Sequence, residues 1–308
     1  MKNVLITGSS GMVGTSLLKF CKSSKKLRIF SPNSKELDLK NKNKIINYLR
    51  KKKIEQIIHL AAKVGGILYN KNNNYSFYYY NNLINNNVIS SSVELGIKNF
   101  INVSSSCMYP KNYKNKMNEK KLFSGQIEDT NIGYGLAKMS SSMFCDIIKK
   151  EFGFNYTTLI PCNLFGENDN FDKEKSHLIP SIIKKSYDYK IGKTKKILIW
   201  GNGESKREFL YVDNLTIFIN KILNKKISDS YINVGCKTDL KVIDYYKLIW
   251  SLMDIKPKFD FDTSKPNGVE RKLLDSSLAI KNHGYSINID LKKGLKRTID
   301  FYSKNYVQ

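Results

Sequence analysis

The chain has 308 residues, 41% apolar and 26% charged, a composition typical of a globular protein with one large domain or two modest ones. No apolar run reaches the roughly 18 residues of a membrane span, and no leader-like segment precedes the apolar residues 4–7, so we expect a cytoplasmic protein without a membrane partner. The net charge is +25, but the lysines are dispersed in short runs such as 51–53 and 195–196, so we expect no nucleic-acid partner.

The first half of the chain alternates short apolar runs with amphipathic segments. We expect strands at residues 4–7, 27–30, 56–60, 100–104 and 157–161. The intervening segments predict helices at 13–21, 42–51, 75–95 and 137–151, the third of them within a tract rich in Asn and Tyr. This alternation predicts an α/β fold with a doubly wound parallel sheet.

After residue 161 the pattern loosens. Loops rich in Asn, Asp, Gly and Lys, at 167–175, 201–207 and 263–268, alternate with helical segments at 178–187 and 242–253. We therefore expect a nucleotide-binding domain at 1–162 and a smaller α/β substrate-binding lobe at 163–308. We allow for a return of the chain to the sheet between about 195 and 240. In open parallel sheets, ligands bind at the carboxyl ends of the strands, where these loops would lie.

A glycine-rich loop joins the first strand to the first helix. Gly8, Gly11 and Gly14 are spaced as Gly-x-x-Gly-x-x-Gly, which permits a tight turn, a close approach of a pyrophosphate and close packing of the helix. The phosphates would lie at the helix N-terminus. This position makes the sheet Rossmann-type, with a dinucleotide contacted by Gly8, Ser10, Gly11, Met12 and Val13.

The end of the second strand bears on the choice of cofactor. An NAD site typically has an acidic residue there, but none occurs before Glu36. Ser31 and Lys35 suit a 2′-phosphate better, so we expect NADP(H), with Asp38 near the adenine edge.

The five cysteines are widely spaced and contain no Cys-x-x-Cys pair, which argues against a disulfide framework and against a metal site. Cys107 differs from the others because it follows Ser105 and Ser106 at the end of the fourth strand. Tyr134 and Lys138 lie four residues apart, on one face of a predicted helix. A lysine ammonium in that position favours the phenolate, so we expect a lowered pKa for Tyr134 and a role in proton transfer.

The set of Ser105, Tyr134 and Lys138 resembles that of the extended short-chain dehydrogenase/reductase superfamily. The chain is more specifically similar to the GDP-L-fucose synthase family, and the match runs collinearly from residue 3 to about residue 300. The segments that carry this resemblance are 61–66, 105–111, 163–166, 169–171, 176–180, 200–203, 207–213, 264–268 and 271–275.

The resemblance implies a reaction on a GDP-4-keto-6-deoxy sugar, either a mannose-type hexose or a heptose. Tyr134 would give a proton to the C4 carbonyl oxygen, Lys138 would tune Tyr134 and hold the nicotinamide ribose, and Ser105 would hydrogen-bond the oxygen. Cys107 would be the base and His177 the acid that epimerise C3 and C5. A thiolate near basic groups has a lowered pKa, and a histidine titrates in a suitable range.

The same resemblance assigns further binding residues and a homodimer through the two long helices. It adds to the cofactor site Leu60, Ala61, Ala62, Lys63, Tyr134, Lys138, Pro161, Asn163, Leu164 and His177. It assigns to the substrate Ser106, Asn163, Lys185, Trp200, Arg207, Arg271 and Lys272.

Several residues depart from the family pattern. Ser10 stands where an arginine is common, residues 31–34 lack the arginine that binds the 2′-phosphate, and Glu167 replaces a proline. Asn214 and the pair 132–133 also differ, which points to a different sugar. Two alternatives stay open: a C4-reductase acting on a sugar epimerised by another enzyme, and a non-catalytic nucleotide-binding protein.

Overall fold

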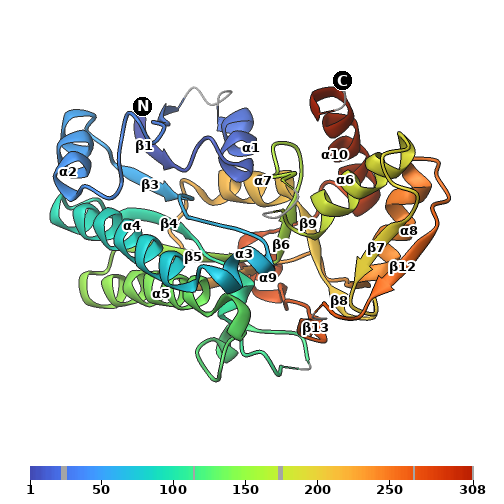
Figure 1. The fold of residues 1–308 in the computed structure, drawn as a ribbon. Helices are drawn as coiled ribbons and strands as arrows, with labels where there is room; N and C mark the ends of the chain where they lie inside the picture. The colour runs from blue at the N-terminus through green and yellow to red at the C-terminus, as the bar shows by residue number, and fades with distance from the viewer. Residues whose placement is uncertain (22–25, 114, 173–175, 266–267, 307–308) are drawn as a thin grey trace.

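Six parallel strands form the central sheet, in the order β10-β5-β4-β3-β1-β2 (Figure 1). The computed structural model describes residues 1–21, 26–113, 115–172, 176–265 and 268–306. The strands are β1 (Lys2–Thr7), β2 (Leu27–Phe30), β3 (Gln56–His59), β4 (Asn99–Val103), β5 (Asn155–Pro161) and β10 (Tyr231–Val234). The order reverses between β1 and β3, the point at which such sheets bind dinucleotides.

Helices cover both faces of this sheet because successive strand residues point to opposite sides. Val4 and Ile6 of β1 face a core shared with α1 (Met12–Cys21) and α7 (Val212–Ile222). Leu5 faces the opposite core, and the helices on that side are α2 (Lys42–Lys51), α4 (Asn74–Glu94) and α5 (Ile132–Phe152). These three strand residues are fully buried. Burial of an apolar side chain of this size stabilises the fold by roughly 1.5–3 kcal/mol.

The predicted Rossmann-type α/β class is confirmed, and the expected strands and helices of the first half are present. Their ends shift by a few residues, and the largest change is that α5 begins at Ile132 instead of residue 137. The Asn- and Tyr-rich tract forms α3 (Ile67–Asn72) and α4, because Phe77, Val88 and Ile89 supply a buried stripe. Residues 173–175 and 266–267, which belong to predicted loops, lie outside the described residues.

A second lobe packs around its own apolar core, with Ile199 and Ile249 among its fully buried members. Its strands make three small sheets: β11-β8-β13, β12-β7 and β6-β9. The elements are β6 (Asn163–Phe165), α6 (Leu178–Lys190), β7 (Ile197–Trp200), β8 (Lys206–Arg207), β9 (Phe209–Tyr211), β11 (Leu240–Lys241), α8 (Val242–Leu252), β12 (Phe259–Asp262), β13 (Arg271–Lys272) and α10 (Leu291–Tyr306). The short helix α9 (Ser277–His283) packs against β10 of the large sheet instead.

The chain also returns to the large sheet after residue 163. α7 and β10 pack in the core of the first lobe, within the 195–240 segment for which we allowed a return. Leu274, Ala279 and Tyr285 join the same core, although we did not expect this of their segment. The two lobes are therefore interleaved in sequence. In the described parts of the chain, no helix combines the length and apolarity needed to cross a membrane.

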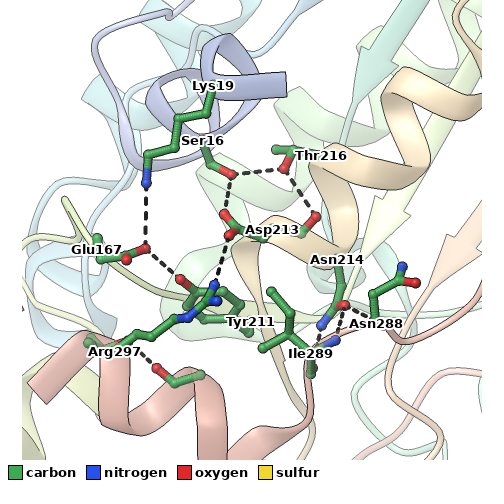
Figure 2. A network of polar contacts seen from close by, with 12 residues as sticks. Ser16, Lys19, Glu167, Tyr211, Asp213, Asn214, Thr216, Asn288, Ile289 and Arg297 are labelled. Carbon is green, nitrogen blue, oxygen red and sulfur yellow. Dashed lines mark hydrogen bonds and ion pairs between the residues drawn. The ribbon is translucent and has the colours of Figure 1, made fainter. Parts of the chain in front are cut away.

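A polar network joins the lobes where α1, α7 and α10 meet (Figure 2). Ser16 of α1 donates to the Asp213 carboxylate at 2.6 Å, and Arg297 of α10 lies 3.5 Å from the same carboxylate. Tyr211 donates to Glu167 at 2.5 Å, and Lys19 lies 3.8 Å from Glu167. Glu167 therefore ties the loop after β6 to β9 and α1.

Asn214, another departure from the family, holds the loop before α10 in this junction. Its amide nitrogen donates to the Ile289 carbonyl at 2.8 Å. Its amide oxygen accepts the backbone N–H groups of Asn288 and Ile289 at 2.8 and 2.9 Å. An aspartate would keep the acceptor but lose the donor. The hydrogen bonds of Asn214 thus account for its presence without reference to the sugar.

We predict that Asn214→Asp lowers the free energy of unfolding by about 1–3 kcal/mol, because a buried carboxylate oxygen would face the Ile289 carbonyl. Urea unfolding should show a lower midpoint with an unchanged m-value. Asn305→Asp is the matched control, since its amide also donates to a backbone carbonyl but lies exposed on α10. Equal midpoints for the two variants would contradict the account.

Candidate active site

The turn after β4 carries a hydroxyl and a thiol. Ser105 precedes the short 3₁₀ helix Ser106–Met108, and its hydroxyl accepts the backbone N–H of Cys107 at 3.3 Å. Cys107 and Ser106 are buried, and Ser105 is half-buried. The serine cap thus fixes the thiol at the carboxyl edge of the sheet, as the sequence predicts.

The first turns of α5 place Tyr134 and Lys138 beside this hydroxyl and thiol. Lys138 is only 3% exposed; its ammonium donates to the Val103 carbonyl at 2.7 Å and lies 5.7 Å from the centre of the Tyr134 ring. Ser105 hydrogen-bonds Tyr134, whose ring packs edge-on against Phe77. The structure therefore brings together the four residues that the sequence predicts for reduction and for the base.

The pKa values differ from the sequence-based expectation. Burial, followed by the neighbouring Cys107 thiol, raises the pKa of Tyr134, and the hydrogen bond with Ser105 only partly offsets this rise. The expectation that Lys138 lowers the pKa of Tyr134 is wrong for the protein alone. The Lys138 ammonium lies over the face of the Tyr134 ring and donates to the Val103 carbonyl. Burial also raises the pKa of the Cys107 thiol, although Ser105, Lys272 and Lys138 act in the opposite direction. The expected low thiol pKa is therefore wrong too.

Burial lowers the pKa of Lys138 to about 8, with Cys107 opposing the shift. Since the unfolded chain binds the proton more tightly, stability should rise with pH between about 8 and 10.5 and carry a penalty below that window. We predict that Lys138→Met stabilises the fold at pH 7 by up to roughly 3 kcal/mol, less the lost bond to Val103. Unfolding curves of both proteins from pH 7 to 10 test this, and a wild-type advantage at pH 7 would contradict it.

Two cations lie side by side on the short adjacent strands β8 and β13. Arg207 and Lys272 are register partners in this parallel pair, and the charge of Lys272 also reaches Cys107. Glu128, just before α5, acts electrostatically on both cations. The sequence did not single out Glu128, because a lone acidic residue in a loop carries no signal without its spatial neighbours.

Arg271 lies next to Lys272 but has a different partner. Its guanidinium donates to both carboxylate oxygens of Asp239, at 2.6 and 3.1 Å. Adjacent residues of a strand point to opposite faces, so Arg271 and Lys272 do not serve the same ligand side by side. Substrate binding by Arg271 stays a prediction. Lys272 is the residue of this basic pair whose charge acts on Cys107.

A third group lies around Trp200, at the end of β7. The indole is 42% exposed, and the ammonium groups of Lys185 and Lys265 lie 5.2 and 6.0 Å from its ring centre. Lys185 also donates to the Leu198 carbonyl at 2.8 Å, which holds it in place. An exposed indole flanked by two cations can border a planar, anionic ligand such as a nucleotide.

His177 directly precedes α6. Its ring is exposed, yet the protein around it lowers its pKa by desolvation. Among the residues that the structure describes, its side chain makes no capping hydrogen bond to α6.

The glycine loop after β1 has the form that a dinucleotide needs. Gly8 has φ +68°, and a Cβ there would lie 2.7 Å from the Ala61 nitrogen, while one at Gly14 would lie 2.4 Å from the Gly8 carbonyl oxygen. Gly11 is exposed at the start of α1, where a side chain would cover the helix N-terminus. These residues fit a bound pyrophosphate.

A hydrogen-bonded ladder joins this loop to the catalytic helix. His59 contacts Thr7 at 2.8 Å through Nδ1 and Asn85 at 3.0 Å through Nε2. Asn85 in turn donates to the Ala137 carbonyl at 3.3 Å. Burial lowers the pKa of His59 to about 4, so the ring is neutral near pH 7. The sequence analysis missed His59, which looks like an ordinary strand residue until its buried partners are known.

The remaining predicted cofactor residues surround the same edge of the sheet. Leu60, Ala61 and Ala62 follow β3, and the Lys63 ammonium donates to Ser76 of α4 at 2.5 Å. Pro161 ends β5 and Leu164 lies in β6, where the Asn163 amide donates to the Glu208 carbonyl at 3.2 Å. Met12 and Val13 begin α1, while Ser10, Ser31 and Lys35 are exposed and Asp38 is half-buried.

The change at 132–133 has a packing explanation. A Cβ at Gly133 would lie 2.1 Å from the Asn74 carbonyl oxygen, so only glycine lets α4 and α5 approach this closely. The Gly133 N–H also donates to the Asn74 side chain at 2.9 Å. As with Asn214, the substitution is tied to a contact within the protein. No group of three His, Cys, Asp or Glu side chains suited to a metal ion occurs among the residues described.

Comparisons with known proteins agree with this arrangement. Residues 4–235 match the NAD dependent epimerase/dehydratase family. The chain is 40% identical to the GDP-L-colitose synthase of Yersinia pseudotuberculosis, over 97% of both chains, and 36% identical to the GDP-L-fucose synthase of Azorhizobium caulinodans, over 98% of this chain and 96% of the other. The GDP-mannoheptose C4 reductase of Campylobacter jejuni with NADP bound has a TM-score of 0.87 at 26% identity, over 98% of each chain. The chain belongs to the NAD dependent epimerase/dehydratase family, in the group of the GDP-L-fucose and GDP-L-colitose synthases.

Proposed function

We propose that this protein is an NADP-dependent oxidoreductase that reduces the C4 ketone of a GDP-4-keto-6-deoxy sugar and also epimerises C3 and C5. The observation that carries the proposal is the grouping of Ser105, Tyr134 and Lys138 around Cys107, with Arg207 and Lys272 close by. Relatives named for GDP-sugar synthesis and reduction support the nucleotide-sugar class. The sugar would be either a mannose-type hexose or a heptose.

Reduction rests on proton transfer to the carbonyl oxygen. NADPH supplies the hydride when it is bound, and the glycine loop with the start of α1 would hold its pyrophosphate. Ser105 would donate a hydrogen bond to the C4 oxygen, and Tyr134 would protonate it as negative charge develops. The raised pKa of Tyr134 keeps the phenol protonated, which suits a proton donor. Lys138 would hold the ribose and stabilise the phenolate that results.

Epimerisation needs a base and an acid beside acidic C–H bonds. The C4 ketone acidifies the protons at C3 and C5, so the Cys107 thiolate would remove a proton to give an enolate and His177 would return one from the other face. Lys272 and Lys138 act to favour the thiolate against burial. Burial outweighs these charges and keeps the pKa of the thiol raised, so the base would act through the minor thiolate form.

The nucleotide would occupy the second lobe. Arg207 and Lys272 carry charges suited to a diphosphate, and Trp200 with Lys185 would border the guanosine. Asn163 and Ser106 remain candidates for the sugar.

A second candidate, a C4-reductase without epimerase activity, is favoured by the raised pKa of Cys107 and by relatives named as heptose reductases. Incubation of GDP-4-keto-6-deoxymannose with the enzyme and NADPH in deuterated buffer separates the two. Deuterium at C3 and C5 of the product, located by NMR, is expected for the first candidate. Reduction without this label would establish the second. Mass spectrometry of products from hexose and heptose substrates would identify the sugar.

We also predict a homodimer through α4 and α5, which pack side by side (Figure 1). Leu136, Met143 and Ile147 are 40–46% exposed and lie along one side of α5, and Tyr75 and Tyr79 are exposed on α4. Light scattering should give a mass about twice the 35.5 kDa of the chain. Met143→Glu combined with Ile147→Glu should halve it, and Ile191→Glu, at the exposed residue directly after α6, is the control. A wild-type mass of one chain would contradict the prediction.

A further inference from the structure

Glu208 is a buried carboxylate at the junction of β8 and β9, only 1% exposed. One carboxylate oxygen accepts the backbone N–H groups of Cys236 at 2.6 Å and Lys237 at 2.9 Å. The other accepts the N–H of Leu274 at 2.9 Å. The carboxylate thus binds the segment after β10 and the segment after β13 to the strand junction that holds it.

Glu208 has no compensating cation among the residues that the structure describes. The titratable groups that interact with it are Cys162, Cys236, Tyr245 and Tyr285, and no Lys or Arg of the described chain forms an ion pair with it. Burial raises its pKa to about 7, against the effect of the amide donors. Retaining an unpaired acid in a core is costly, so its hydrogen bonds are expected to serve a purpose beyond packing.

The close approach of the Glu208 carboxylate to the segment after β10 requires a glycine there. A Cβ at Gly235 would lie 2.5 Å from a carboxylate oxygen of Glu208. The Gly235 N–H donates to Ser276 at 2.8 Å, which ties the same loop to the segment after β13. The carboxylate therefore occupies the centre of a fixed junction between three chain segments.

These segments carry the residues expected to bind the nucleotide. Glu208 directly follows Arg207, and its amide partner Leu274 lies two residues after Lys272. β8 and β13 are each two residues long. Burial, and after it like-charge repulsion from Arg207, lowers the pKa of Lys272. So short a ladder gives little support to two neighbouring cations, whereas the Glu208 carboxylate connects the end of β8 to the segment after β13.

We propose that Glu208 is a positioning residue that holds Arg207 and Lys272 at the separation required to bind the diphosphate of a nucleotide sugar. This inference rests on the proposed function of those two cations. A merely electrostatic influence would have the opposite effect on binding, because removing a negative charge next to cations favours a phosphate. Weaker binding after loss of the Glu208 charge therefore indicates positioning, and tighter binding indicates an effect of charge alone.

The test is calorimetric binding of GDP-mannose, a stable nucleotide sugar without an ionisation near pH 7. At pH 8, Glu208→Gln should bind it at least tenfold more weakly than the wild type, since the amide group opposes one of the backbone donors. NADPH affinity and circular dichroism should stay unchanged, which checks the fold. Glu204→Gln is the matched control, because Glu204 is 58% exposed and pairs with Lys241.

The pH dependence provides a second measurement that does not need a variant. Wild-type affinity for GDP-mannose should fall several-fold from pH 8 to pH 6 as Glu208 takes up a proton. Any protonation of His177, Lys138 or Lys272 on acidification adds positive charge and would strengthen binding instead. If Glu208→Gln folds, its affinity should not fall on acidification.

The outcomes separate the two levels of the argument. If the wild type binds GDP-mannose and Glu208→Gln binds it equally or more tightly, the positioning role is overturned. The proposed function then stays intact. If Glu208→Gln fails to fold, a wild-type affinity that stays constant or rises on acidification would overturn the role. Lack of wild-type binding at pH 8 would contradict the proposed function itself, and the inference with it.

Discussion

Tyr134→Phe should reduce the turnover of a GDP-4-keto sugar by 10²–10⁴-fold, the usual contribution of a positioned proton donor. In the proposed mechanism the Tyr134 phenol, which hydrogen-bonds Ser105, protonates the C4 oxygen. Stopped-flow or steady-state loss of NADPH absorbance measures the effect. Turnover within about threefold of the wild type would show that Tyr134 is not the proton donor.

The fold of Tyr134→Phe should be intact. The ring keeps its edge-on contact with Phe77 at 6.4 Å between centres and its place below the Lys138 ammonium. Binding of NADPH and GDP-mannose should therefore match the wild type. Tyr306→Phe, on the exposed end of α10, serves as a control for loss of a tyrosine hydroxyl.

Cys107→Ser should lower deuterium incorporation at C3 and C5 by at least 10²-fold, because a serine hydroxyl is a far weaker acid than a thiol. Reduction of a 4-keto sugar that is already epimerised should stay within a few-fold of the wild type, since Ser105, Tyr134 and Lys138 remain. NMR of the product in deuterated buffer separates the two activities.

Cys145→Ser is the control for the loss of a buried thiol, since Cys145 lies in the core between α5 and the sheet. Exchange at C3 and C5 that survives in Cys107→Ser would remove Cys107 from the role of base. Because burial raises the thiol pKa, the exchange rate of the wild type should also increase with pH until the thiol titrates.

The periodicity of the first half was sufficient to predict its strands and helices, because each strand is a short apolar run and each helix has one buried face. The glycine loop was equally clear, since Gly8 and Gly14 meet backbone atoms that exclude any Cβ. The second lobe was less predictable. Strands of two residues, such as β8 and β13, leave no periodic pattern to recognise.

The pKa directions could not be predicted from spacing. The pair Tyr134 and Lys138 does share a helical face, but the ammonium lies over the ring and burial dominates both groups. Arg271 and Lys272 were equivalent in sequence. The alternation of side chains along β13 places Arg271 beside Asp239, whereas the charge of Lys272 acts on Cys107.

Buried polar residues were the main omission. His59 and Glu208 each organise several segments that are distant in sequence. Their partners are backbone N–H groups, an amide and a hydroxyl, which leave no motif in the sequence. Only the three-dimensional arrangement shows that these residues connect the cofactor loop, the catalytic helix and the cation pair.

The most direct test of the central claim is transfer of the reducing hydrogen to C4 of the sugar. The enzyme is incubated with GDP-4-keto-6-deoxymannose and NADPH deuterated at the transferable position, and the product is analysed by NMR and mass spectrometry. The account predicts one deuterium at C4 of a GDP-6-deoxyhexose, with one NADPH consumed per product. Consumption of the keto sugar without label at C4, or no reaction with either hexose or heptose substrates, would contradict it.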